Sequence, residues 1–527
     1  MKFAIAMLTA LLFAGAVRAQ APVPGGTLKL YLRDSPGTAS PLEEASRTAT
    51  VPFMGIFNNL VIFDQNQPVN SESSLVPELA TFWSWNVDHT RLSFKLREGV
   101  TWHDGKPFTA ADVKCTFDLL MGTGTDKLRK NPRKSWFANV ERVEAVNPQE
   151  AVLQLKRPQP SILSMLAAGY SAVYPCHVSA AKMRVAPIGT GPFKLATFQM
   201  NEVIRLEKNS NYWKPGRPYL DAIEMPVIGN RATAMLAFSS GKVDMTFPFD
   251  ITGPMAREIK RDAAKAVCAF GPMNSTQNLI VNRERPPFDN PNVRRAMALT
   301  IDRKAFATIM FEGLGDIGGT MLPQPAGIWG MPPETIATMF GYNPDIAKNR
   351  GEGRALMEAA GFGPRNRLSV KVSTRNLPIY RDAAVILIDH LKEIYIDGEL
   401  DPVDTSLWFT RLARKDYAIG MNTTSNAIDD PDQALYENFA CGSERNYSQY
   451  CNPELQKSFD LQSAEIDLEK RKRMVWDIDR RLQEDVARPV ILHQITGTCW
   501  HPAVHGFTPM VNSSANGYRF EDIWIDH

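Results

Sequence analysis

One segment near the end of the first fifth of the chain says most about its architecture: residues 96–113, LREGVTWHDGKPFTAADV. The dipeptide Asp104-Gly105 predicts a tight turn, because glycine adopts positive φ angles without strain. Thr109 is a suitable cap for a helix that follows it. The segment therefore predicts a strand that ends near Leu96, a tight turn and then a helix.

The N-terminal residues have the pattern of a cleavable signal peptide, which we expect at residues 1–19. Lys2 forms a short positively charged n-region, and the apolar run that follows it is shorter than a typical membrane-spanning helix. Small residues at −3 and −1 favour cleavage before Gln20. No cysteine precedes Cys115, so we expect no N-terminal lipid anchor. The prediction is a soluble periplasmic protein, and an uncleaved membrane anchor is the alternative.

Charge and length limit the class of protein. The 527 residues carry 59 Lys and Arg against 57 Asp and Glu, a net charge of +2. Loss of Lys2 and Arg18 with the signal peptide would bring the mature chain to zero. A nucleic-acid-binding protein needs a basic face, so this balance argues against that function. A mature chain of about five hundred residues exceeds what one hydrophobic core organises, and we expect two or three lobes.

Strand and helix patterns both occur along the chain. Short alternating strands are expected at residues 27–32, 92–96 and 151–155. Helices are expected from Pro291, and at residues 345–361, 381–396 and 468–485. Asn290 and Asp345 are the caps of the first two, and Gly361 is the stop of the second. The helix at 468–485 has a heavily charged side, which we interpret as a solvated face. A mixed α/β architecture follows.

Sequence patterns of catalysis are absent. The chain has no Gly-x-x-x-x-Gly-Lys-Ser/Thr phosphate loop and no Gly-x-Ser-x-Gly elbow, and residues 189–191 lack the spacing of a dinucleotide loop. Cys499, His501 and His505 are residue types that bind metals. Pro502 argues against a helix that would present them on one face, and a fourth ligand is missing. We expect no catalytic residue, no metal and no cofactor.

Six cysteines, all after the expected signal peptide, suit an oxidising compartment. Sequence alone leaves many pairings open. Cys441 and Cys451 bracket a polar loop, residues 442–450, and are the easiest pair. Closing so short a loop would stabilise the fold by about 2–3 kcal/mol, because the link lowers the entropy of the unfolded chain.

Five segments together resemble one protein family in their order and spacing. Beside residues 96–113 they are residues 77–83 (PELATFW), 187–195 (PIGTGPFKL), 209–221 (NSNYWKPGRPYLD) and 287–296 (PFDNPNVRRA). The chain resembles the extracytoplasmic solute-binding proteins of family 5, which feed peptide and nickel ABC importers. The resemblance implies a monomeric periplasmic binding component that captures a peptide or peptide-like solute by hinge closure. It would deliver the solute to permease subunits in the inner membrane.

The resemblance also implies the architecture. It predicts an α/β fold with two hinged lobes of the Venus-flytrap type, an extra inserted lobe, and mixed sheets flanked by helices. The family layout places lobe I at residues 20–48, 188–270 and 497–527, lobe II at 49–187, and lobe III at 271–496. Two chain crossings, near residues 270–277 and 493–498, would form the hinge.

The same layout pairs the remaining four cysteines, Cys115 with Cys176 and Cys268 with Cys499. Buried free thiols are the alternative. Cys268 and Cys499 lie beside the two expected crossings. Our hypothesis is that their disulfide holds the two hinge strands in register.

On lobe III the resemblance points to one loop. Peptide-binding relatives carry an aspartate for the ligand ammonium a few residues before an acidic-Pro pair, and here Ala427 occupies that position. An alanine cannot offset the desolvation of a buried ammonium. Asp429 could substitute for the missing acid, or could only shape the turn before Pro431. Asn426 could exchange hydrogen bonds with a ligand.

Four further positions complete the predicted site. Arg375 matches a position where dipeptide-binding relatives hold a ligand carboxylate, which suits a guanidinium fork, and a surface arginine is the alternative. Trp408 matches an aromatic wall, and core packing is its alternative. Arg47 and Thr48 end a lobe I segment that faces the cleft in relatives.

Arg375 and Arg47 could bind anionic groups, but no acid for an ammonium group stands at residue 427, so the chemical class of the ligand is undecided. A non-peptide anionic ligand, such as an opine, a sugar conjugate or a modified amino acid, is the alternative to a peptide. A periplasmic chaperone or sensor that works without a transporter is a further interpretation.

Overall fold

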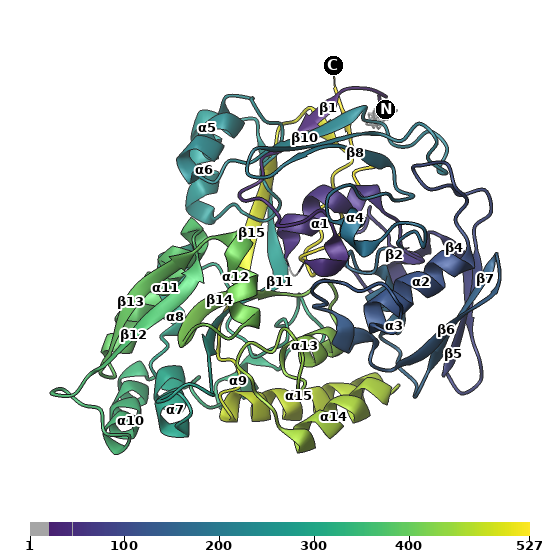
Figure 1. Ribbon diagram of the computed structural model, residues 1–527. Coiled ribbons are helices and arrows are strands. Elements are labelled where there is room, and N and C mark those ends of the chain that lie inside the picture. The colour runs from purple at the N-terminus through teal and green to yellow at the C-terminus, as the bar shows by residue number, and fades with distance from the viewer. Residues whose placement is uncertain (1–20, 45, 527) are drawn as a thin grey trace, which may run out of the picture.

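The computed structural model describes residues 21–44 and 46–526. The expected signal peptide, residues 1–19, lies outside these ranges. The described chain has the predicted mixed α/β fold, with three parts built around separate sheets that we call lobe I, lobe II and lobe III (Figure 1). No helix in the described ranges is long and apolar enough to cross a membrane.

Residues 96–113 have the predicted conformation. Strand β5 (Arg91–Leu96) precedes a turn at Gly105, where φ is 87°. Helix α2 (Ala110–Met121) follows, and a carboxylate oxygen of Asp112 accepts the backbone N–H of Thr109 at 2.9 Å, which caps the helix. The prediction of a strand, a tight turn and a helix is confirmed.

Lobe I contains a four-stranded sheet in the order β1-β10-β9-β8, at the top of Figure 1. Its first strand is shorter than residues 27–32, because Leu30 and Leu32 continue it only as isolated bridges to Met245 and Val227. The other elements of this lobe include two helices and a short C-terminal strand pair. The elements are β1 (Thr27–Lys29), β8 (Phe193–Gln199), β9 (Val203–Lys208), β10 (Ala222–Pro226), α5 (Arg231–Ser239), α6 (Gly253–Asp262), β16 (Val504–His505) and β17 (Trp524–Ile525).

Lobe II contains an antiparallel sheet in the order β4-β5-β7-β6, at the right of Figure 1. Leu92, Phe94 and Leu96 of β5 are buried in alternation with more exposed residues, which is the period of a half-buried strand. Helix α2 packs on β6 and β7. The other elements are β2 (Val61–Phe63), β3 (Leu75–Pro77), β4 (Ala80–Trp85), β6 (Val140–Asn147), β7 (Glu150–Leu155), α3 (Ile162–Ala167), α4 (Ala180–Met183) and the 3-10 turns Glu72–Ser74 and Lys134–Phe137.

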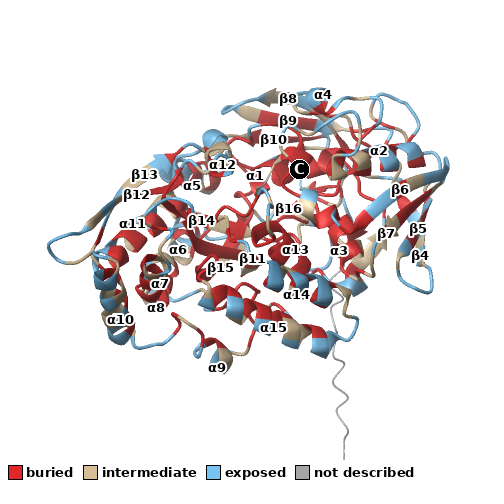
Figure 2. Ribbon diagram, turned by 60° about the horizontal axis from the view of Figure 1, so that its bottom comes forward, coloured by how far each residue is buried: buried red, intermediate tan, exposed pale blue. Residues whose placement is uncertain are grey.

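Lobe III contains a five-stranded mixed sheet in the order β13-β12-β14-β11-β15. Figure 2 shows that most of β11, β14 and β15 is buried, whereas β4 and β6 of lobe II carry many exposed residues. The strands are β11 (Val267–Val281), β12 (Leu368–Arg375), β13 (Ile396–Val403), β14 (Ile419–Ser425) and β15 (Val490–Trp500). The helices are α7 (Pro291–Leu299), α8 (Arg303–Phe311), α9 (Pro333–Ile336), α10 (Ile346–Ala359), α11 (Pro378–Lys392), α12 (Thr405–Ala413), α13 (Pro431–Asn438), α14 (Pro453–Ala464) and α15 (Leu468–Glu484).

The predicted helix caps are present. The Asn290 side chain accepts the backbone N–H of Asn292 at 2.9 Å, and the Asp345 side chain accepts that of Lys348 at 3.0 Å. Gly361, just beyond α10, has a φ of 90°, which an L-residue adopts only with strain.

One helix prediction needs correction, and one needs an addition. The helix expected at 381–396 ends at Lys392, because Tyr395 adopts a φ of 66° and the chain then enters β13. The charged face of α15 is exposed, as predicted, at Arg473, Asp477 and Glu484. The opposite, buried face also carries charged side chains: Arg471 and Asp479 are buried there, and both oxygens of Asp479 accept the backbone N–H of Thr320, at 2.9 and 2.8 Å. Periodicity finds a helix, but it cannot say whether a charged side chain has a buried partner.

β11 and β15 are the long strands that run between lobe I and lobe III (Figure 1). They pair antiparallel, with Cys268 opposite Cys499 near lobe I and Asn278 opposite Val490 in lobe III. The register shifts between Pro272 and Thr276, which leaves a bulge inside the expected hinge. A bulge interrupts the ladder where the backbone must bend.

Three disulfides are present, and they join the pairs expected from the sequence and the family layout: Cys115–Cys176, Cys268–Cys499 and Cys441–Cys451. The second joins directly opposite residues of β11 and β15. The residue limits given above for the three lobes stay a prediction.

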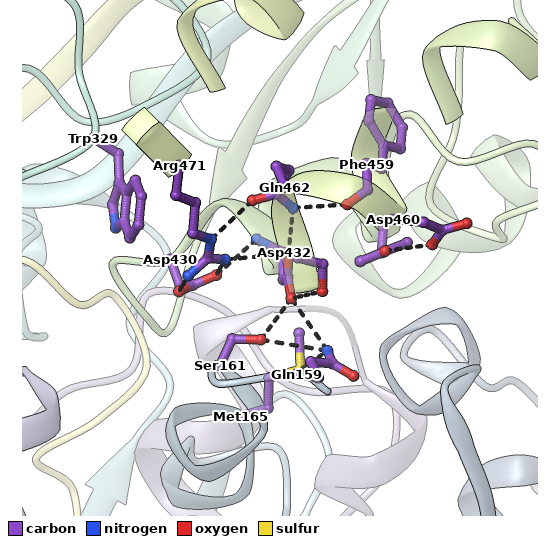
Figure 3. A network of polar contacts seen from close by, with 12 residues as sticks. Gln159, Ser161, Met165, Trp329, Asp430, Asp432, Phe459, Asp460, Gln462 and Arg471 are labelled. Atoms are coloured by element: carbon purple, nitrogen blue, oxygen red, sulfur yellow. Dashed lines mark hydrogen bonds and ion pairs between the residues drawn. The ribbon is translucent and has the colours of Figure 1, made fainter. Parts of the chain in front are cut away.

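A buried polar network joins lobe II to lobe III around Asp432 on α13 (Figure 3). From lobe II, Ser161 donates to its carboxylate at 2.5 Å and Gln159 at 3.2 Å. From lobe III, Ser463 donates at 2.6 Å, and Arg471 makes an ion pair at 3.4 Å. Donors from both lobes thus compensate the desolvation of one buried carboxylate. Separating lobe II from lobe III would remove part of this compensation, so the network stabilises their contact.

We expect Asp432→Asn to lower the free energy of unfolding by about 3–5 kcal/mol, because it removes one partner of a buried ion pair and presents an amide to donors. Urea unfolding followed by circular dichroism measures the change. Asp460→Asn is the matched control on the same seam: its side chain is half exposed and pairs with Arg157 at 2.8 Å. We expect that control to change stability by less than about 1 kcal/mol. Equal effects of the two substitutions would contradict the assignment.

Candidate ligand-binding site

A cavity of about 530 Å³ lies where the three lobes meet. Lobe I contributes Glu44 and Thr48, lobe II contributes Lys130, and lobe III contributes Thr405 and Phe409 of α12. Cavities of a few hundred Å³ that combine apolar and convergent polar side chains hold small-molecule ligands. Because all three lobes line it, the shape of this cavity depends on how the lobes are closed.

An ion pair between Asp34 and Arg375 joins lobe I to lobe III beside this cavity. Asp34 follows β1, and its carboxylate also accepts the Thr48 hydroxyl at 2.9 Å. Arg375 is the last residue of β12, and its guanidinium also donates to Thr405 Oγ1 at 3.0 and 3.1 Å and to the Tyr380 hydroxyl at 3.1 Å. The arginine side chain is only 2% exposed. Arg375 is thus held by a protein carboxylate in this arrangement of the lobes.

Two more buried arginines lie on the lobe I side. Arg33 pairs with Asp250 at 2.8 Å, whereas Arg47 donates to the backbone carbonyl of Pro248 at 2.8 Å. Both guanidinium groups lie over the ring of Phe247, at 5.0 and 5.7 Å from its centroid. Burial, and then the charge of Arg33, lower the pKa of Arg47.

The three arginines carry more charge than the acids beside them. Arg33, Arg47 and Arg375 face the carboxylates of Asp34 and Asp250, which leaves one positive charge in excess. Burial opposes ionisation of Tyr380, yet the guanidinium of Arg375, followed by those of Arg33 and Arg47, lowers the pKa of its hydroxyl. A buried cationic excess favours an anionic group nearby.

Charges of both signs line the cavity itself. Burial raises the pKa of Glu44 to about 7, although the charges of Lys130 and Arg129 act in the opposite direction. Lys130 donates to Thr410 Oγ1 at 2.8 Å, and burial lowers its pKa. Arg129 and Arg414 also line the cavity. The cavity therefore offers one acid and three cations to a ligand.

The structure brings together only part of the predicted site. Arg375, Arg47 and Thr48 lie close to the Asp34 carboxylate or to the arginine cluster, as described. Trp408 is fully buried in a core cluster with Ile280 and Leu412, and its indole N–H donates to Asn422 at 3.2 Å. This position matches the core-packing alternative.

The predicted loop residues point to other partners. The Asn426 side chain donates to the side-chain oxygen of Asn274 at 3.2 Å. Asp429 accepts the backbone N–H of Ile328 at 3.1 Å, and its backbone carbonyl accepts the indole N–H of Trp329 at 2.9 Å. Burial raises the pKa of Asp429 to about 7. Neither residue lines the cavity between the lobes.

The three residues whose spacing suggested a metal site each have a different partner. Cys499 is in a disulfide, His501 contacts the carbonyl of Phe238 at 2.9 Å, and His505 pairs with Asp526 at 3.0 Å. Across residues 21–44 and 46–526, no group of three His, Cys, Asp or Glu side chains could hold a metal ion.

Sequence reasoning missed Asp34, Glu44 and Tyr380. Asp34 had a weak signal, since a charged pair, Arg33-Asp34, directly follows the expected alternating strand at residues 27–32. Glu44 lies in the segment that faces the cleft in relatives, yet nothing in the sequence separates it from Glu43. Tyr380 lies five residues after Arg375 on the next helix, and only the folded chain shows that the two side chains meet.

The comparison with known proteins decides the family. Residues 74–446 match the sequence model of the bacterial extracellular solute-binding proteins, family 5. The chain belongs to this family. A relative named "Probable di/tripeptide-binding protein 5" of Pseudomonas aeruginosa is 23% identical over 511 residues, which cover 92% of this chain and 94% of the relative. The glutathione-binding protein GsiB of Escherichia coli is 28% identical over 301 residues, which are 56% of this chain and about half (54%) of that protein.

Solved structures of family-like binding proteins share the fold. The periplasmic binding protein DppA of Helicobacter pylori, in complex with the peptide STSA, superposes with a TM-score of 0.82 at 20% identity, covering 96% of this chain and 99% of that one. The binding protein AgaA from A. tumefacien R10, in complex with agropinic acid, gives 0.82 at 22% identity and covers 95% and 99%. Proteins of this fold thus include both peptide and non-peptide complexes.

We expect Asp34→Ala to favour the open arrangement of the lobes, because closing them would then bury the Arg375 guanidinium without its carboxylate. Small-angle X-ray scattering of the ligand-free protein measures this as a larger radius of gyration than that of the wild type. Asp382→Ala is the matched control, since its ion pair with Arg231 also joins lobe III to lobe I, at 3.5 Å, but its side chain is 52% exposed. An unchanged radius in Asp34→Ala would contradict a closing role.

We expect Glu44→Gln to stabilise the ligand-free protein at pH 8 and to leave it unchanged at pH 4. The pKa of Glu44 is higher in the fold, about 7, than its ordinary 4.5, so the fold loses stability as pH rises from about 4.5 to about 7. Glutamine removes that cost, which is at most about 3 kcal/mol. Thermal unfolding at both pH values tests this, with Glu454→Gln on the exposed face of α14 as control. A lower melting temperature at pH 8 would contradict the argument.

Proposed function

We propose that this protein is the substrate-binding component of an ABC importer and captures a peptide or peptide-like solute in the cavity between its lobes. The observation that carries this proposal is the lining of the cavity. Glu44, Lys130 and Phe409 come from three different lobes, so a ligand that touches all three stabilises the closed arrangement. Membership of an extracellular solute-binding family supports the same role.

Hinge closure is the proposed mechanism. β11 and β15 connect lobe I to lobe III, and the bulge at Pro272–Thr276 supplies a place where backbone angles can change. The Asp34–Arg375 pair joins lobe I to lobe III, so opening the lobes would break it. A ligand shifts the equilibrium by no more than its difference in affinity for the two arrangements. The permease subunits would then recognise the closed shape.

Location and assembly are part of the proposal. The signal-peptide pattern at residues 1–19 supports export, and the disulfides support an oxidising compartment such as the periplasm. We propose that the mature protein works there as a monomer.

A non-peptide anionic solute is the second candidate for the ligand. The unbalanced positive charge at Arg33, Arg47 and Arg375 favours an anion. The structural likeness to AgaA with agropinic acid shows that this fold accommodates such acids, and the relative of Pseudomonas aeruginosa supports peptides instead. Both candidates use the same cavity and the same closure.

Calorimetric titration of the refolded, ligand-free protein tests the proposal with short peptides and opine-type acids as probes. We expect at least one class to bind and to reduce the radius of gyration. Phe409→Ala should weaken that binding at least about tenfold, because a buried aromatic wall contributes roughly 1.5–3 kcal/mol. Leu407→Ala on the same helix is the control, since Leu407 is 62% exposed and lies outside the cavity. Failure of all probes to bind, or equal effects of the two variants, would contradict the proposed site.

A further inference from the structure

The position where an ammonium anchor is expected cannot supply one in this protein. Ala427 is fully buried and has no polar side chain. Its backbone N–H donates to Gln433 Oε1 at 2.8 Å, and its carbonyl accepts Ser513 Oγ at 2.8 Å and Asn516 Nδ2 at 2.9 Å. Neither the side chain nor the backbone of residue 427 remains available to a ligand amine.

The other acids near the lobe junction already have partners. Asp34 is held by Arg375 and Thr48, and Asp250 by Arg33. Glu43 accepts Arg184 Nε at 2.8 Å and the backbone N–H of Arg129 at 2.7 Å. Asp429 accepts Ile328 N–H outside the cavity. Each of these carboxylates would have to lose a protein contact before it could bind a ligand.

Glu44 differs from all of these acids. Its carboxylate lines the 530 Å³ cavity, and among the residues that the structure describes it accepts no hydrogen bond and has no cation within 4 Å. Its backbone carbonyl accepts a guanidinium N–H of buried Arg133. An unpaired carboxylate that is presented to a cavity is suited to binding a cationic group.

We infer that Glu44 of lobe I binds the ammonium group of the ligand, in place of the acid that is missing at Ala427. This inference rests on the proposed function and narrows its ligand class. Lys130, Arg129 and Arg414 line the same cavity without a carboxylate within 4 Å in the described chain. The ligand therefore carries one amine and more than one carboxylate, as in an acidic dipeptide or a γ-glutamyl conjugate.

An ammonium-binding acid on lobe I, and not on lobe III, changes which ligand contacts stabilise the closed arrangement of the lobes. In this arrangement the amine binds lobe I through Glu44, while Arg414 at the end of α12 and Lys130 attract the carboxylates from lobe III and lobe II. A ligand with charges at both ends spans the junction between the lobes. Removal of either charge therefore removes one contact and also shifts the equilibrium away from the closed arrangement.

Calorimetry with matched probes tests the inference at pH 8, where the Glu44 carboxylate is ionised. The probes are Glu-Glu, N-acetyl-Glu-Glu, which lacks the ammonium, and Ala-Ala, which lacks the additional carboxylates. We expect the wild type to bind Glu-Glu at least about tenfold more tightly than either other probe, since a charge-assisted contact contributes about 1.5–3 kcal/mol. Glu44→Gln should abolish the preference over N-acetyl-Glu-Glu, and Glu454→Gln should retain it.

Proton release gives a second readout that a structural role would not produce. An ammonium beside Glu44 lowers the pKa of its carboxyl, so Glu-Glu binding near pH 7 should release part of a proton from the wild type and none from Glu44→Gln. The charged groups that face Glu44 are Lys130, Arg129, Glu43 and Arg133, and all are present in both proteins. Titration in buffers of different ionisation enthalpy measures this release.

Three results of these titrations would contradict the role of Glu44. A preference that survives in Glu44→Gln but is lost in Asp429→Asn would overturn the inference in favour of the lobe III loop. Wild-type binding of N-acetyl-Glu-Glu or of an opine acid, but not of Glu-Glu, would overturn the inference and leave the proposed function intact. Binding of none of these probes would overturn both.

Discussion

The pairing of β11 with β15 is the constraint on which the arrangement of the whole molecule depends. These strands run between lobe I and lobe III, and the direct opposition of Cys268 and Cys499 fixes their register at the lobe I end. Buried backbone groups must keep their hydrogen bonds, so the ladder can yield where it is already interrupted, between Pro272 and Thr276 and again between Gln277 and Asn278. This pair of strands therefore sets how lobe I and lobe III sit on either side of the cavity.

Several buried charges at the seams between the lobes are matched, whereas two at or beside the candidate site lack an opposite charge. Asp432 accepts hydrogen bonds from lobe II and lobe III, and Asp34 pairs with Arg375 beside the cavity. By contrast, the described residues place no carboxylate within 4 Å of Arg47, whose guanidinium contacts a backbone carbonyl, a methionine sulfur and the Phe247 ring. Among the same residues, the Glu44 carboxylate faces the cavity without a hydrogen-bond or ion-pair partner. Unpaired buried charges lower stability, and they are retained in proteins chiefly where function needs them. This contrast locates the site more sharply than the size of any cavity does.

Local features were predictable from the sequence because their causes are local. The turn at Gly105 follows from the freedom of glycine, and the caps Thr109, Asn290 and Asp345 follow from side chains that accept nearby N–H groups. Predictions that depended on remote partners fared differently. Trp408 could have formed a wall or a core, and packing against Ile280 places it in the core. The acids Asp34 and Glu44 carried no signal strong enough to single them out, because a carboxylate in a sequence does not reveal its partner.

By itself, the sequence determined the family, the α/β class and the local conformation of residues 96–113, because these follow from patterns of neighbouring residues and from the order of several motifs. It also determined that the side chain of Ala427 cannot bind an amine. Only the tertiary structure decided that Arg375 meets Asp34 and that Glu44 faces a cavity together with Lys130. The physical reason is that burial and pairing of a charge depend on residues tens to hundreds of positions away, which only the folded chain brings together.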